Sequence, residues 1–489
     1  MNPYVIASIV IGYFALLILI SFLTSRKANN DTFFTGNRRS PWFVVAYGMI
    51  GASLSGVTFM SVPGYVQSSQ FTYFGVVLGY TIGYVVIAFV LLPLYYKLNL
   101  TSIYTYLDRR FGSNSQRTGS FFFIVSRLMG SALRMYLVVF VLHEFVFKAI
   151  GVPFWALALF FIVLILVYTF KGGIKTIIWT DTLQTTFLLL STVITIVFLL
   201  KEMDISFFDM MSQAADDGYT KMFETDWRSN NFFLKQILSG AFITIAMTGL
   251  DQDMMQKNLT CKSLKEAKKN MLSFSVCIVI VNILFLVLGV ALMTYSSHTG
   301  FVLPEKSDSI FAAVAQNLGS VTWIIFIIGL VAAGYSSADG TLTSLTTTFC
   351  FDILQFDKKP NYDEQKKTRT RKITHIAFAA IYFLIIIVFK PFHTDSLIKT
   401  LFDIAGYTYG PLLGLFCFGL FVKRRNPNDK AVPFIAILSP VISYLLNIYS
   451  EELFFGYKFG FEILIVNGLL TFIGLLIFSK KSGNMLLKH

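Results

Sequence analysis

The sequence predicts an all-helical integral membrane protein with about thirteen membrane-crossing helices. Hydrophobic residues make up 55% of its 489 positions and charged residues only 14%, whereas a soluble domain carries roughly 25% charged residues. The mean hydropathy is +0.66. Long apolar runs recur along the chain, and they lack the period-two alternation of membrane β-strands. The composition therefore excludes a soluble enzyme, a disordered chain and a disulfide-bonded scaffold.

Thirteen apolar runs approach the length of about 20 residues that a helix needs to cross a bilayer. They lie near residues 4–24, 43–65, 73–97, 119–147, 153–170, 179–200, 233–250, 272–297, 323–350, 373–389, 399–421, 431–449 and 461–478. We expect the first run to be a span and not a signal peptide, since no basic segment precedes it and Arg26 and Lys27 follow it. The connecting loops are short, so residues 1–489 should form a single transmembrane domain.

The basic residues predict the orientation of the chain. If the N-terminus is outside, most of the 40 Lys and Arg residues, Lys257 among them, lie in cytoplasmic loops or the C-terminal tail. Such loops retain Lys and Arg, so we expect an outside N-terminus and a cytoplasmic C-terminus, most simply in a bacterial inner membrane. The net charge of +13 then needs no nucleic-acid partner, since no soluble domain presents it.

The second span is interrupted by small and polar residues. Residues 51–64 contain three glycines, four hydroxyl side chains and a proline. A packing seam between helices is one explanation. A helix broken at mid-membrane is the other, and the density of Ser53, Ser55 and Thr58 favours it. The freed carbonyl groups of such a break could coordinate a cation, and its hydroxyl groups could contact a substrate.

The seventh span is interrupted in a similar way over residues 239–252, and it lies five spans after the second. Two broken helices five spans apart are typical of an inverted five-helix repeat, because an odd repeat length reverses the topology. The two core repeats should therefore occupy about 43–200 and 233–421. The peripheral helices are then expected at 4–24, 431–449 and 461–478.

The ninth span carries a polar stripe at helical spacing, which comprises Ala333, Ser336, Asp339, Gly340, Thr343 and Ser344. An aspartate inside a span is costly and marks a functional site by default. Oxygen ligands of these kinds suit a small hard cation; a solvated helix end would explain only the residues from Thr343 onward. Asp181, at the start of the sixth span, is either a helix-start acid or a second cation ligand or proton acceptor.

These motifs resemble those of the sodium:solute symporters, relatives of the sodium–glucose and bacterial sodium–galactose transporters. The resemblance covers essentially the whole chain, through SLSGVTFMSVPG at 53–64, GGIKTIIWTDTLQ at 172–184, GLDQDMMQ at 249–256, AAGYSSADGTL at 332–342 and AGYTYGPLLGLF at 405–416. It implies the leucine-transporter type of fold, with two inverted five-helix repeats plus peripheral helices. It also implies a transporter that couples its solute to sodium, with no organic cofactor and no enzymatic reaction.

By the same resemblance, five residues form the main sodium site, through two backbone carbonyls and a small-x-x-Ser-Ser pattern: Gly51, Leu54, Ala333, Ser336 and Ser337. Sialic acid members of the family hold a second sodium through the aspartate of the WTD motif and two later serines. Asp181 matches that aspartate, but Asp339 and Gly340 stand at the serine positions. Asp181 and Asp339 are therefore candidates for a second cation site that departs from the family pattern.

The resemblance also implies substrate residues. Ser55 and Thr58 match polar substrate positions of the sialic acid symporters. Arg134 matches an intramembrane arginine of those proteins if one gap is assumed. It could bind a substrate carboxylate, or it could pair structurally within the bundle. Further candidates for the cavity wall or a gate are Ser53, Tyr73, Thr244, Thr248, Tyr407 and Thr408.

Together these patterns predict a sodium-coupled secondary carrier, active as a monomer, that imports a small polar solute such as an acidic sugar or another organic anion. A neutral-sugar symporter remains an alternative. So does a proton-coupled carrier with Asp181 or Asp339 as the proton acceptor. A membrane enzyme would need a nucleophile, histidine or metal constellation, which the sequence lacks. A channel would need a continuous pore, whereas broken helices favour an occluded site.

Overall fold

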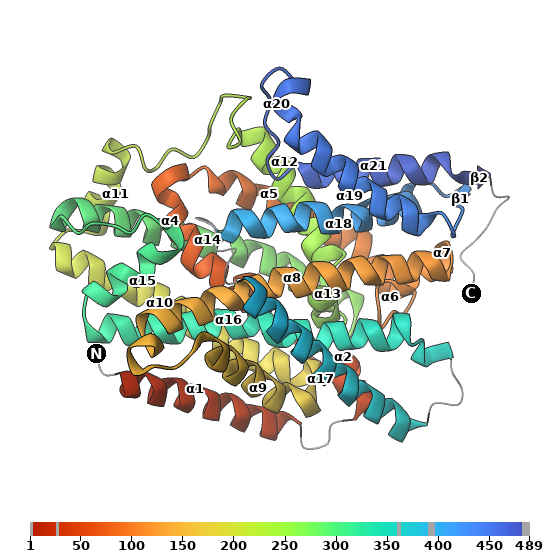
Figure 1. The fold of residues 1–489 in the computed structure, drawn as a ribbon, viewed down its shortest axis with the longest axis horizontal. Coiled ribbons are helices and arrows are strands. Elements are labelled where there is room, and N and C mark those ends of the chain that lie inside the picture. The colour runs from red at the N-terminus through yellow and green to blue at the C-terminus, as the bar shows by residue number, and fades with distance from the viewer. Residues whose placement is uncertain (1–2, 26–28, 359–362, 390–396, 482–489) are drawn as a thin grey trace.

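Long helices run side by side through the computed structural model, most of them roughly along its longest axis (Figure 1). The structure describes residues 3–25, 29–358, 363–389 and 397–481, so Arg26 and Lys27 lie outside the described residues. Helix α1 (Pro3–Thr24) begins at one end of the long axis, and strand β2 (Ser479–Lys481) lies at the other. This arrangement is the one expected for an odd number of crossings.

The first part of the chain forms the helices α2 (Asn30–Thr35), α3 (Trp42–Ser53), α4 (Gly56–Ser69), α5 (Tyr73–Val86), α6 (Leu92–Lys97), α7 (Thr105–Arg110), α8 (Ser113–Phe145), α9 (Phe154–Gly172), α10 (Ile174–Met203) and α11 (Phe207–Asp216). The second part forms α12 (Phe233–Thr244), α13 (Gln252–Asn258), α14 (Leu264–Thr299), α15 (Ser307–Asn317), α16 (Ser320–Thr348), α17 (Glu364–Phe389), α18 (Leu397–Phe421), α19 (Val432–Ile448), α20 (Ser450–Leu453) and α21 (Ile463–Ile477).

Short irregular turns join or extend several of these helices. Three are π-helical, namely η2 (Ile87–Leu91), η4 (Ile245–Gly249) and η5 (Phe349–Ile353), and three are 3₁₀ turns, namely η1 (Gly36–Arg38), η3 (Phe147–Ile150) and η6 (Phe356–Lys358). Strand β1 (Arg425–Pro427) pairs antiparallel with β2. This small ribbon ties the segment after α18 to the segment after α21.

The apolar helices follow the predicted runs closely. Among the described residues, eight helical segments are long and apolar enough to cross a membrane, and two bent pairs, α3/α4 at 60° and α12/α13 at 70°, raise the number to as many as ten. Helices α9, α19 and α21 are shorter apolar helices that coincide with the runs predicted at 153–170, 431–449 and 461–478. The structure therefore supports eight to ten spans, and the count of thirteen stays a prediction.

Apolar side chains cover much of the outer surface. On α1, Ile11 is 57% exposed and Phe22 61%, and on α19 Phe434 is 75% exposed. Contiguous exposed apolar surface is unfavourable in water but suits a hydrocarbon environment. These faces and the length of the helices are those of a multi-pass membrane protein.

Helices α5 and α12 pack with their backbones in contact. Gly75, Gly79 and Gly83 recur every four residues on α5. A Cβ atom at Gly83 would lie 2.7 Å from the carbonyl oxygen of Ala241, and one at Gly75 would lie 2.9 Å from the Cβ atom of Gln236. Small residues at this spacing allow two membrane helices to approach closely. We call this contact the glycine seam; α12 is the first helix of the second bent pair.

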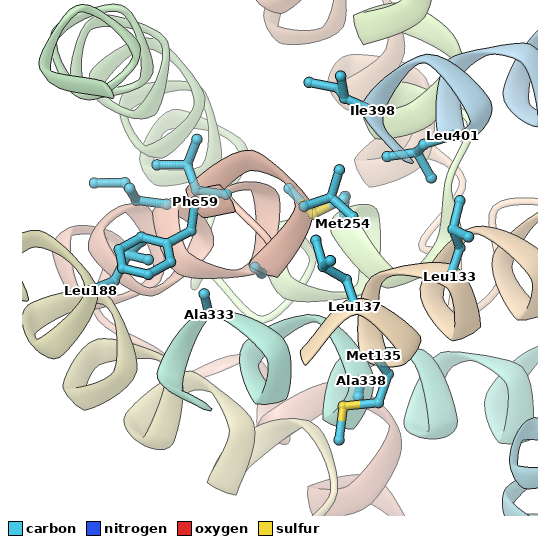
Figure 2. Packing of buried hydrophobic residues seen from close by; sticks show 14 of the residues in the cluster. Phe59, Leu133, Met135, Leu137, Leu188, Met254, Ala333, Ala338, Ile398 and Leu401 are labelled. Carbon is cyan, nitrogen blue, oxygen red and sulfur yellow. The ribbon is translucent and has the colours of Figure 1, made fainter. Parts of the chain in front are cut away.

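The buried core joins the two bent pairs to the helices around them. Figure 2 shows part of it, including Leu133 of α8, Met254 of α13, Ala333 of α16 and Leu401 of α18. All four belong to one continuous apolar cluster. Segments far apart in the sequence therefore enclose the polar groups that lie between the two bends.

Candidate functional site: a polar cavity between two broken helices

The first break separates α3 from α4 at Leu54 and Ser55, within the span that the sequence predicts to be interrupted. Ser55 is extended, with φ −76° and ψ 176°. The Leu54 N–H donates to the Ile50 carbonyl at 2.8 Å, and helical bonding resumes where the Phe59 N–H donates to the Ser55 carbonyl at 3.0 Å. The last turn of a helix leaves carbonyl oxygens without intrahelical partners. The break therefore provides oxygen ligands next to Gly51 and Leu54.

Gly51 holds the end of α3 against two other helices. Its N–H donates to Thr185 Oγ1 of α10 at 2.9 Å. A Cβ atom at this position would lie 2.5 Å from Thr185 Oγ1 and 3.1 Å from Ser336 Oγ of α16. The close approach requires glycine, because a larger residue would push the helices apart. The structure thus brings Gly51 beside Ser336, and Ala333 and Ser337 lie buried on the same helix.

Asp181 joins Ser336 to a buried lysine. Ser336 Oγ donates to Asp181 Oδ1 at 2.9 Å, and Lys257 Nζ donates to Asp181 Oδ2 at 2.8 Å. Each of these side chains is at most 1% exposed. Asp181 lies two turns inside α10, so it belongs to a buried site and is not a helix-start acid. The assignment of Lys257 to a cytoplasmic loop is wrong, because its ammonium group neutralises a buried carboxylate.

Asp339 takes different partners from Asp181. Tyr168 of α9 donates its hydroxyl to Asp339 Oδ2 at 3.0 Å, and the Gly340 N–H donates to Asp339 Oδ1 at 2.6 Å. The side chain is fully buried. Both carboxylates are therefore engaged by donors of the protein, and their role as a second cation site stays a prediction.

The second break lies between the π-helical turn η4 and α13, at Leu250 and Asp251. Asp251 Oδ1 accepts from the Met254 N–H at 3.1 Å and so caps α13. Tyr409 of α18 donates its hydroxyl to Asp251 Oδ2 at 2.5 Å, and Arg127 Nη1 lies 3.6 Å from the same oxygen. Both oxygens of the Asp251 carboxylate therefore accept hydrogen bonds, and the Arg127 cation lies beside one of them.

Neighbouring groups complete the second break. Arg127 also pairs with Asp253, and Lys257 Nζ lies 3.9 Å from Asp253 Oδ1. The hydroxyl of Tyr95 donates to the Gly249 carbonyl and that of Tyr104 to the Leu250 carbonyl, each at 2.8 Å. Arg127, Asp251, Asp253, Lys257 and Asp181 thus form one buried ionic network.

A cavity of about 70 Å³ lies between the two breaks. At roughly 10–15 Å³ for one water molecule, this volume accommodates a handful of waters or a small solute. The cavity takes its polar wall from six helices and the π-helical turn η4, through Ser53, Thr58, Tyr73, Tyr80, Tyr84, Arg127, Arg134, Thr244, Thr248 and Asn282. Its apolar wall includes Ile398, Leu401 and Phe402 at the start of α18. Six predicted substrate residues line it, namely Ser53, Thr58, Tyr73, Arg134, Thr244 and Thr248.

Arg134 connects this cavity to the serine pair of α16. Its Nη1 donates to Ser337 Oγ at 3.3 Å. Its Nε is buried and has no hydrogen-bond partner in the described part of the chain. An arginine with a spare buried donor at a cavity wall can bind an anionic group. The hydrogen bonds of the described residues therefore leave one donor of Arg134 available for a ligand.

Three of the predicted substrate residues lie elsewhere. Ser55 is buried in the first break and does not line the cavity; its Oγ has no partner among the described residues. Tyr407 accepts a hydrogen bond from Asn447 of α19 at 2.8 Å, and Thr408 Oγ1 donates to the Ile404 carbonyl at 2.7 Å. The geometry gives no support to Tyr407 and Thr408 as cavity residues; on that helix Tyr409 reaches the ionic network instead.

The sequence interpretation missed several groups at the site. Arg127, Tyr80, Tyr84 and Asn282 line the cavity, and Lys257 completes the ionic network. A signal was present for Lys257, because Asp253 stands four residues before it and the (i, i+4) spacing places both side chains on one helix face. Nothing in the sequence marks Asn282, which is one polar residue in a long apolar run.

A bundle of apolar helices that encloses a polar cavity between two broken helices defines the chain as a multi-pass membrane transporter. Residues 33–430 match the model of the sodium:solute symporter family. The chain belongs to the sodium:solute symporter family. This membership confirms the prediction of a sodium-coupled transporter of a small solute and not an enzyme.

Relatives agree over nearly the whole chain. The sodium/sialic acid symporter NanT of Aliivibrio fischeri is 27% identical, over 92% of this chain and 89% of the relative. The sodium/sialic acid symporter SiaT of Proteus mirabilis is 26% identical, over 95% and 94%. The fold matches that of a Na⁺-coupled sialic acid symporter in a substrate-bound outward-open state, with a TM-score of 0.83, 24% identity and coverage of 97% of this chain and 99% of that one.

Proposed function

We propose that the protein imports a small organic anion together with sodium by alternating access, and that an acidic sugar of the sialic acid kind is its first candidate substrate. The names of the two relatives support this substrate class. The chemistry of the cavity supports it independently, because Arg134 presents a buried donor beside several hydroxyl groups. A neutral sugar would leave that guanidinium without a counter-charge.

The proposed sodium site lies where α3 ends against α16. Its ligands are the carbonyl oxygens of Gly51, Leu54 and Ala333 and the hydroxyl groups of Ser336 and Ser337. The approach of Gly51 to Ser336 supports this assignment. Sodium is a hard cation that prefers oxygen ligands. Ser336 donates its hydroxyl proton to Asp181, which leaves the lone pairs of Ser336 Oγ for sodium, and Asp181 with Asp339 remains the candidate for a second cation.

The observation that carries the proposal is the hydrogen bond from Arg134 to Ser337. Arg134 faces the cavity, and Ser337 is a proposed sodium ligand. A substrate anion that attracts the guanidinium would release the lone pairs of Ser337 Oγ for sodium. A sodium ion at Ser337 would in turn repel the guanidinium toward the substrate. Each ligand then favours the binding of the other, which is the reciprocal coupling that symport requires.

The energetics are adequate for accumulation. One sodium ion that enters across 100 mV releases about 2.3 kcal/mol, and a tenfold sodium gradient adds about 1.4 kcal/mol. Together they allow roughly 500-fold accumulation of a neutral solute per sodium ion. A monovalent anion moving with one sodium ion carries no net charge, so its accumulation would follow the sodium gradient alone.

The membrane arrangement is part of the proposal. Thirteen crossings in a monomer, with an outside N-terminus and two inverted five-helix repeats at 43–200 and 233–421, would place the breaks of α3/α4 and α12/α13 at equivalent positions. The basic loops support this orientation, as do the opposite locations of α1 and β2 in Figure 1. A bacterial inner membrane is the proposed location.

Uptake into proteoliposomes tests the coupling. We expect uptake of sialic acid to require an inward sodium gradient, and we expect Arg134→Gln to abolish it while Arg134→Lys retains part. Full uptake in sodium-free buffer with only a proton gradient would contradict sodium coupling. Stabilisation by a neutral sugar, with none by any acid, would contradict the assignment of Arg134.

A second measurement tests the sodium site. Ser337→Ala removes one proposed ligand and should raise the sodium concentration for half-maximal uptake about tenfold, the effect of losing roughly 1.4 kcal/mol. Ser344→Ala is the matched control: it lies two turns further along α16, and its hydroxyl donates to the Thr341 carbonyl. An unchanged sodium requirement in Ser337→Ala would remove this residue from the site.

A further inference from the structure

Asn282 of α14 presents a buried acceptor at the cavity wall. The residue is 1% exposed and lines the cavity between the two breaks. Its Nδ2 donates to the Ile278 carbonyl of the same helix at 2.8 Å. A carbonyl oxygen can only accept, so this bond fixes the orientation of the side-chain amide. The other end of the amide is therefore the oxygen Oδ1.

That oxygen has no hydrogen-bond partner in the described part of the chain. A buried polar atom without a partner is costly, and native structures contain few of them. When such an atom belongs to a residue of a ligand cavity, the missing partner can come from the ligand. Oδ1 can accept only from a donor, namely a hydroxyl or an N–H group.

Arg134 is the second residue of the same cavity with an unpaired buried atom, and it offers the complementary chemistry. Its Nε is a donor without a partner among the described residues. The cavity thus combines an unused donor on a cation from α8 with an unused acceptor on an amide from α14. A solute that satisfies both must carry an anionic group and, at another position, a hydroxyl or N–H donor.

We infer that Asn282 is a specificity-determining residue that selects acids with a hydrogen-bond donor over acids without one. This inference rests on the proposed function, and it narrows the substrate class from organic anions to hydroxylated or amide-bearing acids. Simple alkyl carboxylates and inorganic anions leave Oδ1 buried without a partner. A site built around an unpaired polar group rejects a ligand that lacks the matching group.

Sodium-dependent ligand binding to the purified full-length protein tests the inference with acids of matched size. L-lactate carries a hydroxyl donor, whereas propionate does not; sialic acid is the larger donor-rich acid. We expect the wild-type protein to bind lactate at least tenfold more tightly than propionate. Asn282→Leu, similar in shape, should erase this ratio and weaken sialic acid about tenfold, the effect of one lost hydrogen bond.

Two further variants separate selectivity from folding. Asn282→Thr should retain part of the ratio, because its hydroxyl can donate to the Ile278 carbonyl and still accept from the ligand. Asn270→Leu replaces another buried asparagine of α14 that does not line the cavity, and it should leave the ratio unchanged. Loss of the ratio in Asn270→Leu as well would mean that it reports general damage to α14 and would overturn the inference.

The outcomes distinguish the inference from the function on which it rests. Equal binding of lactate and propionate by the wild type, or an unchanged affinity of Asn282→Leu for every acid that the wild type binds, would overturn the role of Asn282 while sodium-dependent binding persists. If no acid binds in sodium, the proposed function fails and the inference falls with it.

Discussion

The two broken helices of this transporter differ in how their polar groups are paired within the protein. The first break, in α3/α4, has no charged residue between positions 42 and 69, and the hydroxyl groups of Ser55 and Ser61 are buried without partners among the described residues. The second break, in α12/α13, is surrounded by ion pairs and tyrosine hydroxyl groups. The first leaves its serine hydroxyl groups available. At the second, the Asp251 carboxylate and the carbonyl groups of Gly249 and Leu250 are paired within the protein, and only Asp253 Oδ1 and Gln256 Oε1 of α13 lack a hydrogen-bond partner among the described residues.

This difference indicates that the first break responds to ligands and that the second break stabilises the fold. Groups that the protein leaves unsatisfied are costly until a ligand arrives, so the first break gains most from sodium and substrate. Groups that the protein satisfies itself hold a fixed geometry before any ligand arrives. We therefore expect substitutions at the second break to affect stability, and substitutions at the first break to affect the response to ligands.

The largest effect should come from Lys257→Met at the second break. The change leaves Asp181 buried without its cation, and an unpaired buried charge costs about 3–5 kcal/mol. Thermal unfolding of the detergent-solubilised protein measures this loss. The double variant with Asp181→Asn should recover most of the stability, and the exposed Lys269→Met serves as control. Wild-type stability in Lys257→Met would contradict the ionic network.

A smaller effect is expected for Tyr409→Phe. The substitution removes the hydroxyl that donates to Asp251 at 2.5 Å, and hydrogen bonds to charged groups contribute about 1.5–3 kcal/mol. The matched control is Tyr407→Phe on the same helix, whose partner is the neutral Asn447 at a half-buried position. Unfolding in denaturant compares the two. An equal or greater loss in Tyr407→Phe would mean that Asp251 does not need the phenol.

The smallest change in stability should follow Ser55→Ala at the first break. Because Ser55 Oγ is unpaired, its removal should alter the stability of the ligand-free protein by less than about 0.5 kcal/mol. The rise in melting temperature on addition of sodium and substrate should nevertheless shrink. A large loss of stability without ligands would show that Ser55 is structural and would erase the contrast between the breaks.

The sequence was informative where a residue type conflicts with its surroundings. The glycine and serine residues of 51–64 predict the first break, because their density exceeds what helix packing requires. Asp181 and Asp339 were recognisable for the same reason, as carboxylates within apolar runs. Lys257 was misassigned, because a count of basic residues treats each one near a loop as solvated and cannot see the acid that it pairs with across the fold.

Helix phase explains why the sequence interpretation chose Tyr407 and Thr408 of α18 and missed Tyr409. The motif AGYTYG places Tyr407, Thr408 and Tyr409 within one turn, and successive residues of a helix point about 100° apart. The two-residue step from Tyr407 to Tyr409, a rotation of about 200°, therefore moves the side chain from α19 to the ionic network. The structure contains eight to ten segments of spanning length, and the three remaining predicted runs coincide with the shorter helices α9, α19 and α21, so the count of thirteen stays a prediction.

The glycine seam places α12, the first helix of the second bent pair, in direct contact with α5. Because α5 and α12 touch backbone to backbone, one cannot slide along the other without a steric clash. We therefore expect the two helices to tilt as one rigid body, with Leu250 and Asp251 at the end that follows α12 and η4. A movement of α5 would then displace the second break and the ionic network by a similar amount. The ionic network would therefore respond directly to the opening and closing of the carrier.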